Sequence, residues 1–360
     1  MTFFGKYLAL VAVAPFLVLS GCNQTTVQSS GARDLANSLV IPAAADLKLL
    51  TRDKIDEKIC GRFGVEPYAT NNIKQVREPH WPNQNGGAHQ FIHKNAQHLA
   101  YALTTNDDTN ADFVSRLMKA VNSNAYTVLD FEGRGGGSPS FLTAVLIKSI
   151  SYSVSYLDSR QALTDAQRTS IYNWVKKLEE NVYARESSPD HRAAIATSFI
   201  MAGAAFRDEA LFKKGLAKYE ISLSRLDDDI AFSSQVRINN EVMHHMLPGA
   251  EVLLLNGIDV FSIKFGERTF HDTIEHHANQ VIKTGSKKVN TGPDVDIARS
   301  IMRAEGFGTH LAWIPVYLNT FPDTKAAASL VALDKVLRKT DYKNYYGTQL
   351  GIHSGCLFRM

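Results

Sequence analysis

From residue 46 to the end of the chain, apolar residues recur at three- and four-residue spacing with few interruptions. A representative series is Ala193, Ala196, Phe199, Ile200 and Ala204. This spacing collects apolar side chains on one face of an amphipathic helix. Segments that alternate apolar and polar residues, as half-buried strands do, are nearly absent from the sequence. The pattern therefore predicts an all-α fold for this part of the chain.

The periodic segments predict helices over residues 47–60, 88–104, 109–122, 139–158, 164–184, 191–206, 208–225, 237–256, 267–284, 294–318 and 324–338. The links between them are mostly short and contain helix caps or breakers, as at Ser188-Pro189-Asp190. Short links favour antiparallel helix pairs, and no repeat of fixed period indicates a regular solenoid. We expect an incomplete α/α barrel (toroid) of antiparallel helix pairs over residues 46–360, with a generic helical bundle as the alternative.

Two segments interrupt the helical pattern and are predicted to be loops, residues 61–87 and 131–140. The first contains Trp81, whose indole offers a flat face for a sugar ring. The second contains Arg134 within a glycine-rich run that lacks the Gly-Lys-Ser/Thr of a phosphate loop. It is either a mobile flap over a cleft or a flexible connection.

The N-terminal residues have the features of a secretory signal. Lys6 precedes an apolar stretch from Leu8 to Leu19, which is too short to span a membrane comfortably. The next residues complete Leu19-Ser20-Gly21-Cys22, which resembles the bacterial lipobox, whose cysteine is acylated. We therefore expect residues 1–21 to be removed and Cys22 to be lipidated, although a chance cysteine after a plain signal peptide is the alternative.

Residues 22–45 are rich in Ser, Thr, Gln, Asn and Ala, which is typical of a flexible tether. Asn23, rather than an acidic residue, follows the cysteine and is consistent with sorting to an outer membrane. The expected location is the cell envelope, on the periplasmic face of the outer membrane, with the membrane contacted through the lipid anchor.

Charge and cysteine content exclude several functional classes. Lys and Arg number 39 against 36 Asp and Glu, a balance too even for a nucleic-acid binder. Three cysteines without a Cys-x-x-Cys pair are too few for a zinc array. In an oxidising compartment, Cys60 and Cys356 could form a disulfide that links the two ends of the folded part. The alternative is that both remain unpaired thiols.

The segment from 237 to 248 is the most informative for chemistry. At helical spacing, Arg237, Asn240, Glu241 and His244 share one face, and His245 follows directly. A guanidinium, an amide, a carboxylate and two imidazoles suit the binding of an anionic, hydroxyl-rich ligand and the movement of a proton. A solvated helix face is the alternative interpretation.

Several short motifs occur in order between residues 188 and 320. They are Asp190-His191 before an alanine-rich helix, Arg207-Asp208-Glu209-Ala210-Leu211-Phe212, Arg237 with His244 seven residues later, Met246-Leu247-Pro248, and Ala312-Trp313-Ile314-Pro315-Val316-Tyr317. Their order and spacing resemble the alginate lyase superfamily, the helical polysaccharide lyases that act on poly-mannuronate. The resemblance covers a little over a third of the chain. Trp313 and Tyr317 are expected in the core.

The sequence departs from the family at two positions. The family has Asn before its histidine, where this chain has Asp190, which would orient His191. The family tyrosine is a histidine here, and the spacing from Arg237 selects His244, whereas the spacing to Leu247-Pro248 selects His245.

The resemblance implies a β-elimination at a uronic acid of an acidic polysaccharide. Such a lyase neutralises the uronate carboxylate, removes the proton on C5 and protonates O4 as it leaves. By resemblance, His191 and Arg237 neutralise, Asn239 or Asn240 replaces the missing amide, and His244 or His245 moves protons. The expected catalytic residues are His191, Arg237, Asn240, His244 and His245. The expected substrate-binding residues are Trp81, Arg134, Arg192, Asn239 and Glu241.

The remaining histidines do not predict a metal site or another cofactor. His271, His276 and His277 lie on one predicted helix, and His89 and His93 are four residues apart, but the Glu of His-Glu-x-x-His is missing. We expect a monomer whose partner is an acidic polysaccharide.

Two alternative functions stay open. One is an inverting glycoside hydrolase on a related α/α barrel, which would need two opposed carboxyl groups, with Glu132, Asp190 and Glu241 as candidates. The other is a non-catalytic polysaccharide-binding lipoprotein of the envelope.

Overall fold

The structure is a computed structural model of the full chain. It describes residues 40–49, 60, 75–77, 87–105, 107–130, 139–182, 188–227, 229–234, 236–286, 311–340, 346–347 and 350–357. Within these ranges the side chain of Arg237 and a few others are also left undescribed. All of these residues belong to the compact unit that spans Arg33–Met360.

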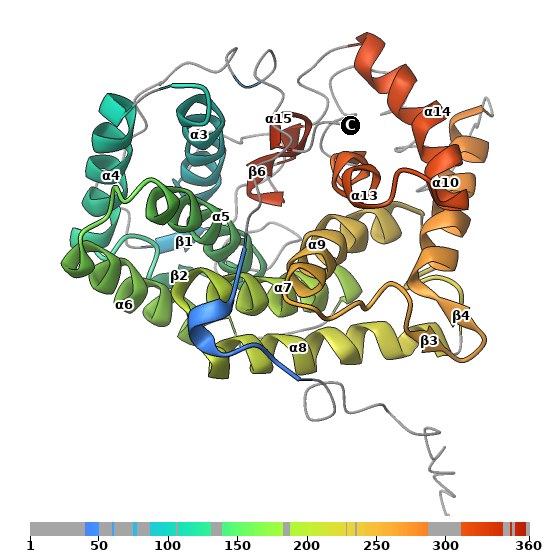
Figure 1. Cartoon of the computed structure of the whole chain (residues 1–360), viewed down its shortest axis with the longest axis horizontal. Helices are drawn as coiled ribbons and strands as arrows, with labels where there is room; N and C mark the ends of the chain where they lie inside the picture. Colours follow the sequence, from blue (N-terminus) through green and yellow to red (C-terminus); the bar gives the residue numbers. More distant parts are fainter. Residues whose placement is uncertain are drawn as a thin grey trace, which may run out of the picture. The chain divides into compact units, whose positions relative to one another are not determined.

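Most of the described residues are helical, which confirms the all-α class (Figure 1). The helices are η1 (Ala44–Asp46), α3 (Gly87–Ala102), α4 (Asp107–Asn122), α5 (Pro139–Ser159), α6 (Asp165–Asn181), α7 (Pro189–Phe206), α8 (Glu209–Leu223), η2 (Ser224–Asp227), α9 (Val236–Leu255), α10 (Phe270–Ser286), α13 (Ile314–Thr320), α14 (Lys325–Thr340) and α15 (Ser354–Leu357). The strands are β1 (Gln75–Arg77), β2 (Val128–Asp130), β3 (Lys264–Phe265), β4 (Arg268–Thr269), β5 (Tyr346–Gly347) and β6 (Ile352–His353).

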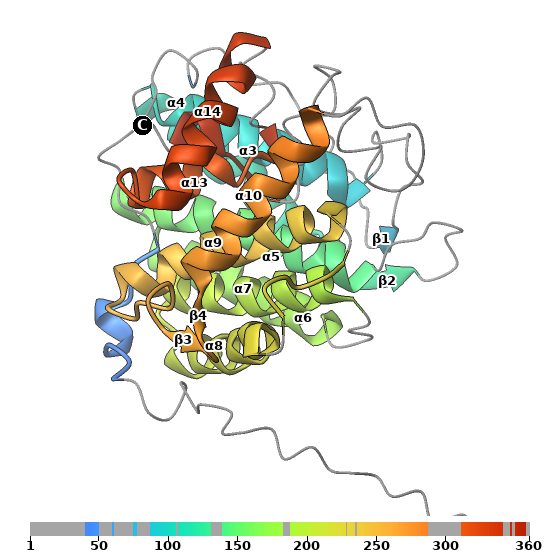
Figure 2. The same cartoon turned by 90° about the vertical axis from the view of Figure 1, so that its right-hand side faces the viewer.

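Helix α7 is the centre of the packing. It is apolar on nearly every side, and its residues from Ala193 to Phe206 are all buried. It packs most extensively against α8, α9 and α5. Figures 1 and 2 both show α7 between α8 on one side and α5 and α9 on the other. The N-terminus of α7 is therefore held within reach of both α5 and α9.

The close approach of α7 and α8 depends on glycine. A Cβ added at Gly203 would lie 2.5 Å from the backbone nitrogen of Phe212, and one at Gly215 would lie 2.5 Å from that of Ile200. No side chain larger than hydrogen fits at either position without moving a backbone. These two helices thus form a tight antiparallel pair, as the short link between them predicts.

The predicted breakers do end and begin helices. Pro189 occupies the first turn of α7, where its missing N–H costs no hydrogen bond. Arg207 closes α7 with a left-handed backbone, φ 59° and ψ 41°. Asp208 then caps α8 by accepting a hydrogen bond from the backbone N–H of Leu211. These local signals explain why the predicted boundaries here agree with the structure to within a few residues.

The first predicted helix, 47–60, is wrong at its start. Residues 47–49 are not helical, and they follow the short helix η1. Leu47 and Leu49 are buried, and the side chain of Asn256 bonds both the N–H and the C=O of Lys48. These bonds to a side chain more than two hundred positions away hold the segment in a non-helical conformation. The spacing of apolar residues cannot reveal such a distant contact. Residues 50–59 lie outside the described residues.

Part of the predicted loop 61–87 is a strand. β1 pairs in parallel with β2, with Gln75 opposite Val128 and Arg77 opposite Asp130. A strand of three residues is too short to show alternation in the sequence. The predicted helix 294–318 is described only from residue 311, and α13 begins there at Ile314.

The two ends of the folded part meet. Ile41, in the segment predicted to be a tether, already packs against the core. Cys60 and Cys356 are joined by a disulfide, with their Cα atoms 5.0 Å apart. Of the two alternatives that the sequence leaves open, the structure contains the bridge. Gly351, with φ +78°, lets the C-terminal segment pass directly against Ser149 of α5.

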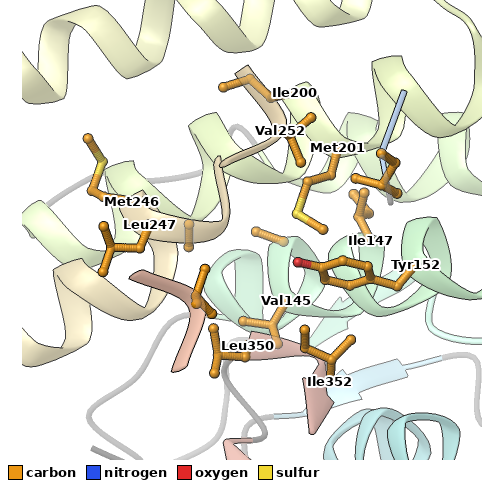
Figure 3. Close-up of a cluster of buried hydrophobic side chains, with 14 of the residues drawn as sticks. Val145, Ile147, Tyr152, Ile200, Met201, Met246, Leu247, Val252, Leu350 and Ile352 are labelled. Atoms are coloured by element: carbon orange, nitrogen blue, oxygen red, sulfur yellow. The ribbon is translucent and has the colours of Figure 1, made fainter. Parts of the chain in front are cut away.

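Helix α5 forms the inner part of the core. By length and composition it could cross a membrane, but 89% of the qualifying window is buried inside the protein, as expected of a core helix. Figure 3 shows its residues Val145, Ile147 and Tyr152 among side chains of α7, α9 and β6. The helices that carry the predicted site therefore share one hydrophobic core.

Candidate functional site

Helix α7 presents Asp190 and His191 in its first turn. Asp190 is buried, and the side chain of His191 is 15% exposed to solvent. Nε2 of His191 lies 3.8 Å from Oδ2 of Asp190, which is an ion-pair distance rather than a hydrogen bond. Oδ1 of Asp190 and Nδ1 of His191 are buried without a hydrogen-bond partner among the described residues. Both groups retain bonding capacity at the start of this helix.

His245 of α9 lies next to His191. The ring of Phe141, near the start of α5, has its centroid 4.7 Å from that of His191 and 5.2 Å from that of His245. A charge on His191 also acts on His245. The sequence cannot choose between His244 and His245 as the replacement for the family tyrosine. The structure brings His245 to His191.

Behind His245 lies Lys148 of α5. Its Nζ is 2.8 Å from Nδ1 of His245, and both side chains are fully buried. Nε2 of His245 is buried without a hydrogen-bond partner among the described residues. The imidazole is thus held at one nitrogen and unpaired at the other.

His244 occupies a different environment on α9. Its Nδ1 lies 2.8 Å from the backbone carbonyl oxygen of Asn240, and a carbonyl can only accept. The proton of a neutral His244 therefore resides on Nδ1, and Nε2 is the acceptor nitrogen. Successive residues of a helix differ by about 100°, so His244 and His245 leave α9 in different directions.

Asn240 connects α9 to α10 and to Trp313, the residue that precedes α13. Its Oδ1 accepts from Nε2 of His277 at 2.7 Å and from Nε1 of Trp313 at 3.1 Å. Because the indole nitrogen can only donate, the oxygen of the amide must face it. Nδ2 is buried without a hydrogen-bond partner among the described residues. On a regular helix Asn240 lies about 140° around α9 from His245, so these contacts lie on a different side of α9 from His191.

Asn239 bonds the segment that precedes α9. Its Oδ1 accepts from the backbone N–H of Ser233 at 3.0 Å, and its Nδ2 donates to the carbonyl of Ser233 at 2.7 Å. Both ends of the amide are engaged in this turn. Its predicted role in substrate binding stays a prediction.

Burial disfavours the charged form of the two imidazoles that contact Phe141. Desolvation lowers the pKa of His245 well below its ordinary value, and Lys148, His244 and His191 lower it further. Desolvation also lowers the pKa of His191, against a smaller opposite effect from Asp190. The pKa of Lys148 is likewise well below its ordinary value because the side chain is buried. Burial therefore disfavours a positive charge on His245, His191 and Lys148.

The other predicted residues are only partly described. Glu241 and Arg192 lie on α9 and α7, and Glu241 is buried. Arg237 is in the first turn of α9, but its side chain lies outside the description. Trp81, Arg134 and Cys22 lie outside the described residues.

The histidines considered as metal ligands have other contacts. His277 faces Asn240, His276 contacts Gln280, and Nδ1 of His271 lies 2.7 Å from the hydroxyl of Tyr317. Trp313 and Tyr317 are buried, which confirms their place in the core. Among the described residues, no three His, Cys, Asp or Glu side chains are arranged to hold a metal ion.

Lys148 and Phe141 are the members of the site that sequence analysis misses. Lys148 is the one charged residue between positions 139 and 157, in an otherwise apolar or hydroxyl-bearing helix. A charge isolated in a core helix is the signal that could have identified it. Phe141 carries no such signal, because aromatic residues are common in cores.

A hollow of about 590 Å³ lies elsewhere, between α4 and the N-terminus of α6. Its lining includes Val114, Met118, Lys119 and Gln167, and it contains none of the predicted site residues.

Known structures share this arrangement of helices. The crystal structure of alginate lyase A1-III from Sphingomonas species A1 matches with a TM-score of 0.60 and 14% identity, over 92% of this chain and 94% of that chain. The fold is that of an alginate lyase. The predicted incomplete α/α barrel is thereby confirmed.

Two variants of the same enzyme, each complexed with a tetrasaccharide, match equally well. One has a histidine replaced by alanine, with a TM-score of 0.61, 13% identity and coverage of 92% of this chain and 99% of that one. The other has a tyrosine replaced by phenylalanine, with a TM-score of 0.60, 13% identity and coverage of 91% and 99%. No protein-family model and no curated protein sequence matches this chain. The likeness to alginate lyase is one of fold.

Proposed function

We propose that this protein is a polysaccharide lyase that cleaves an acidic, uronate-containing polysaccharide by β-elimination. The observation that supports this most strongly is the contact of His191 and His245, from two different helices, with the same Phe141 ring. This cluster lies on a fold shared with alginate lyases. The residue types that were substituted in the tetrasaccharide complexes of alginate lyase A1-III are a histidine and a tyrosine. This chain has His191, and we assign His245, rather than His244, to the place of the tyrosine in the motif.

The chemistry requires three tasks of the site. The proton on C5 of a uronate is only weakly acidic, because the adjacent carboxylate already carries negative charge. Neutralising that carboxylate stabilises the carbanion-like transition state. A base must then accept the C5 proton, and an acid must protonate O4 as the C4–O4 bond breaks.

His245 suits proton transfer. It is neutral because burial lowers its pKa, and its Nε2 has no hydrogen-bond partner among the described residues. His191 and Arg237 are the groups we assign to the uronate carboxylate. Phe141 and His191 are partly exposed, whereas His245 is fully buried, so the substrate would approach His245 from the side of these two residues.

We also propose that the protein works in the cell envelope. Residues 1–21 would serve as a signal peptide, and lipidated Cys22 would anchor the mature protein to the outer membrane. The disulfide between Cys60 and Cys356 is consistent with folding in an oxidising compartment. Its acidic polysaccharide substrate would then be a polymer that enters or leaves the envelope.

The test is a lyase assay with the purified mature protein. Acidic polysaccharides, including poly-mannuronate, are incubated with the protein, and ultraviolet absorbance is followed because an unsaturated uronate product absorbs there. Rising absorbance that is lost in His191→Ala supports the proposal. New reducing ends without absorbance would indicate a hydrolase, and binding without cleavage would indicate a binding protein. Either result would overturn the proposed lyase.

A further inference from the structure

The place of Lys148 in α5 calls for a physical reason. An ammonium group at 0% exposure loses its hydration, so burying its charge is unfavourable. The side chain ends 2.8 Å from Nδ1 of His245, between the two helices that contribute Phe141 and His245 to the site. A residue that is costly to bury and directed at the proposed base is unlike a packing residue.

Among the described residues, the ionisable groups that act on His245 are all bases. They are Lys148 from α5, His191 from α7 and His244 from α9 itself. Burial lowers the pKa of both Lys148 and His245 well below their ordinary values, and each base opposes a positive charge on its neighbours, so we take the resting pair as neutral. A neutral lysine has an amine lone pair, and an imidazole N–H is a stronger donor than an amine N–H. In the resting state the bond between them therefore runs from Nδ1–H of His245 to Nζ of Lys148.

We propose that Lys148 is the proton acceptor behind His245, so that one imidazole serves first as base and then as acid. The catalytic step rests on the proposed lyase function. The bond from Nδ1–H to Nζ fixes the tautomer of His245 and leaves the lone pair of Nε2 directed away from Lys148, toward the unpaired side of the ring.

The protons balance over one turnover. Nε2 of His245 takes the proton from C5, while the proton on Nδ1 moves to Nζ of Lys148. The electrons of the C5–H bond form the C4–C5 double bond, and the C4–O4 bond breaks. O4 takes the proton from Nε2, and Nδ1 regains its proton from Nζ. The enzyme returns to its starting state, with the positive charge held in the meantime on the amine.

The amine is the right place for that charge. Lysine is ordinarily more basic than histidine by about four pKa units. Burial lowers the pKa of both groups, and we take the added proton to reside on the amine because the ordinary pKa of lysine is the higher of the two. His245 is then neutral again and can give up its Nε2 proton to the leaving oxygen.

Nitrogen NMR on the wild-type protein tests the arrangement without substrate. Histidine labelled with ¹⁵N gives distinct shifts for protonated and unprotonated ring nitrogens, and His245→Gln assigns the signal. A neutral His245 with its proton on Nδ1 at about pH 7 supports the proposal. A proton on Nε2, or an imidazolium, would overturn it.

Two variants test the catalytic step. Lys148→Met removes the acceptor and should lower kcat by about 10²-fold with little change in KM. Lys148→Arg keeps a donor that cannot lose its charge, and it should not restore kcat. Wild-type turnover in Lys148→Arg would overturn the proposal. Lys177→Met, at an exposed lysine bonded to Asn124, is the matched control and should keep full activity.

The outcomes separate this inference from the proposed function. Circular dichroism and thermal melting identify a variant that fails to fold, in which case the wild-type NMR result decides the question. If the wild type cleaves no polymer, the lyase proposal fails, whereas the tautomer of His245 still supports or refutes the Lys148 bond.

Discussion

The indole nitrogen of Trp313 donates to Oδ1 of Asn240 across 3.1 Å, in a position where both side chains are fully buried. The same oxygen also accepts from His277. One amide oxygen therefore satisfies two buried donors, one from helix α10 and one from the residue that precedes α13. This bond network fixes how α9 lies against them.

Asn240→Leu should destabilise the protein without removing its chemistry. The substitution leaves the N–H groups of Trp313 and His277 without an acceptor, at roughly 1–3 kcal/mol for each. We expect the free energy of unfolding to fall by about 2–5 kcal/mol in urea titrations.

Asn240→Asp is the matched variant, since it keeps an acceptor oxygen for both donors. If Asn240 instead neutralises the substrate, Asn240→Asp would abolish turnover while the protein stays stable. That result would contradict the packing role.

The sequence predicts the helices well where local signals determine them. Pro189, the cap at Asp208 and the apolar spacing in α7 act within a few residues, so they are visible without a structure. The segment 47–49 is different, because Asn256 determines its conformation from a distant part of the chain. Apolar periodicity describes which face is buried, but not which distant side chain binds the backbone.

The site could be predicted by residue type, but not by geometry. His191 and the two histidines of α9 are identified from motif order, yet the choice of His245 depends on where α5 places Phe141. Asn239 and Asn240 are equivalent candidates in the sequence. In the structure Asn239 bonds Ser233 and Asn240 bonds His277 and Trp313, because adjacent residues of a helix point in different directions.

His245→Gln and His244→Gln should affect turnover unequally. Losing the proton-transfer group at His245 should lower kcat by about 10²- to 10⁴-fold. His244 is bonded to the carbonyl of Asn240 on another side of α9, so its replacement should cost far less. Steady-state kinetics on the best polymer found in the lyase assay make the comparison. A greater loss in His244→Gln would show that the wrong histidine has been assigned.

The disulfide should contribute to stability more than to activity. Cys60 and Cys356 are 296 positions apart in sequence, and linking them restricts the unfolded chain. The double substitution Cys60→Ser with Cys356→Ser should lower the free energy of unfolding by roughly 2–5 kcal/mol. Turnover at low temperature should be kept, because neither cysteine bonds any of the described site residues. Dithiothreitol should destabilise the wild type and leave the double variant unchanged, and equal sensitivity of both would refute the assignment.

His277 should make the protein acid-sensitive. Burial lowers the pKa of His277 to about 3 from an ordinary value of 6.5, with a smaller effect of His276. Between these pH values the unfolded chain binds a proton that the folded chain does not, so stability falls as the pH drops below about 6.5. At pH 5 the loss from this group is about 2 kcal/mol relative to neutral pH.

In His277→Gln, whose amide N–H can still donate to Asn240, the urea midpoint should fall less between about pH 7.5 and about pH 5 than in the wild type. His276→Gln, which removes the neighbouring imidazole, is the control and should keep most of the wild-type pH dependence, since desolvation is the larger cause of the shift. Parallel curves for the wild type and His277→Gln would show that His277 does not carry this acid sensitivity.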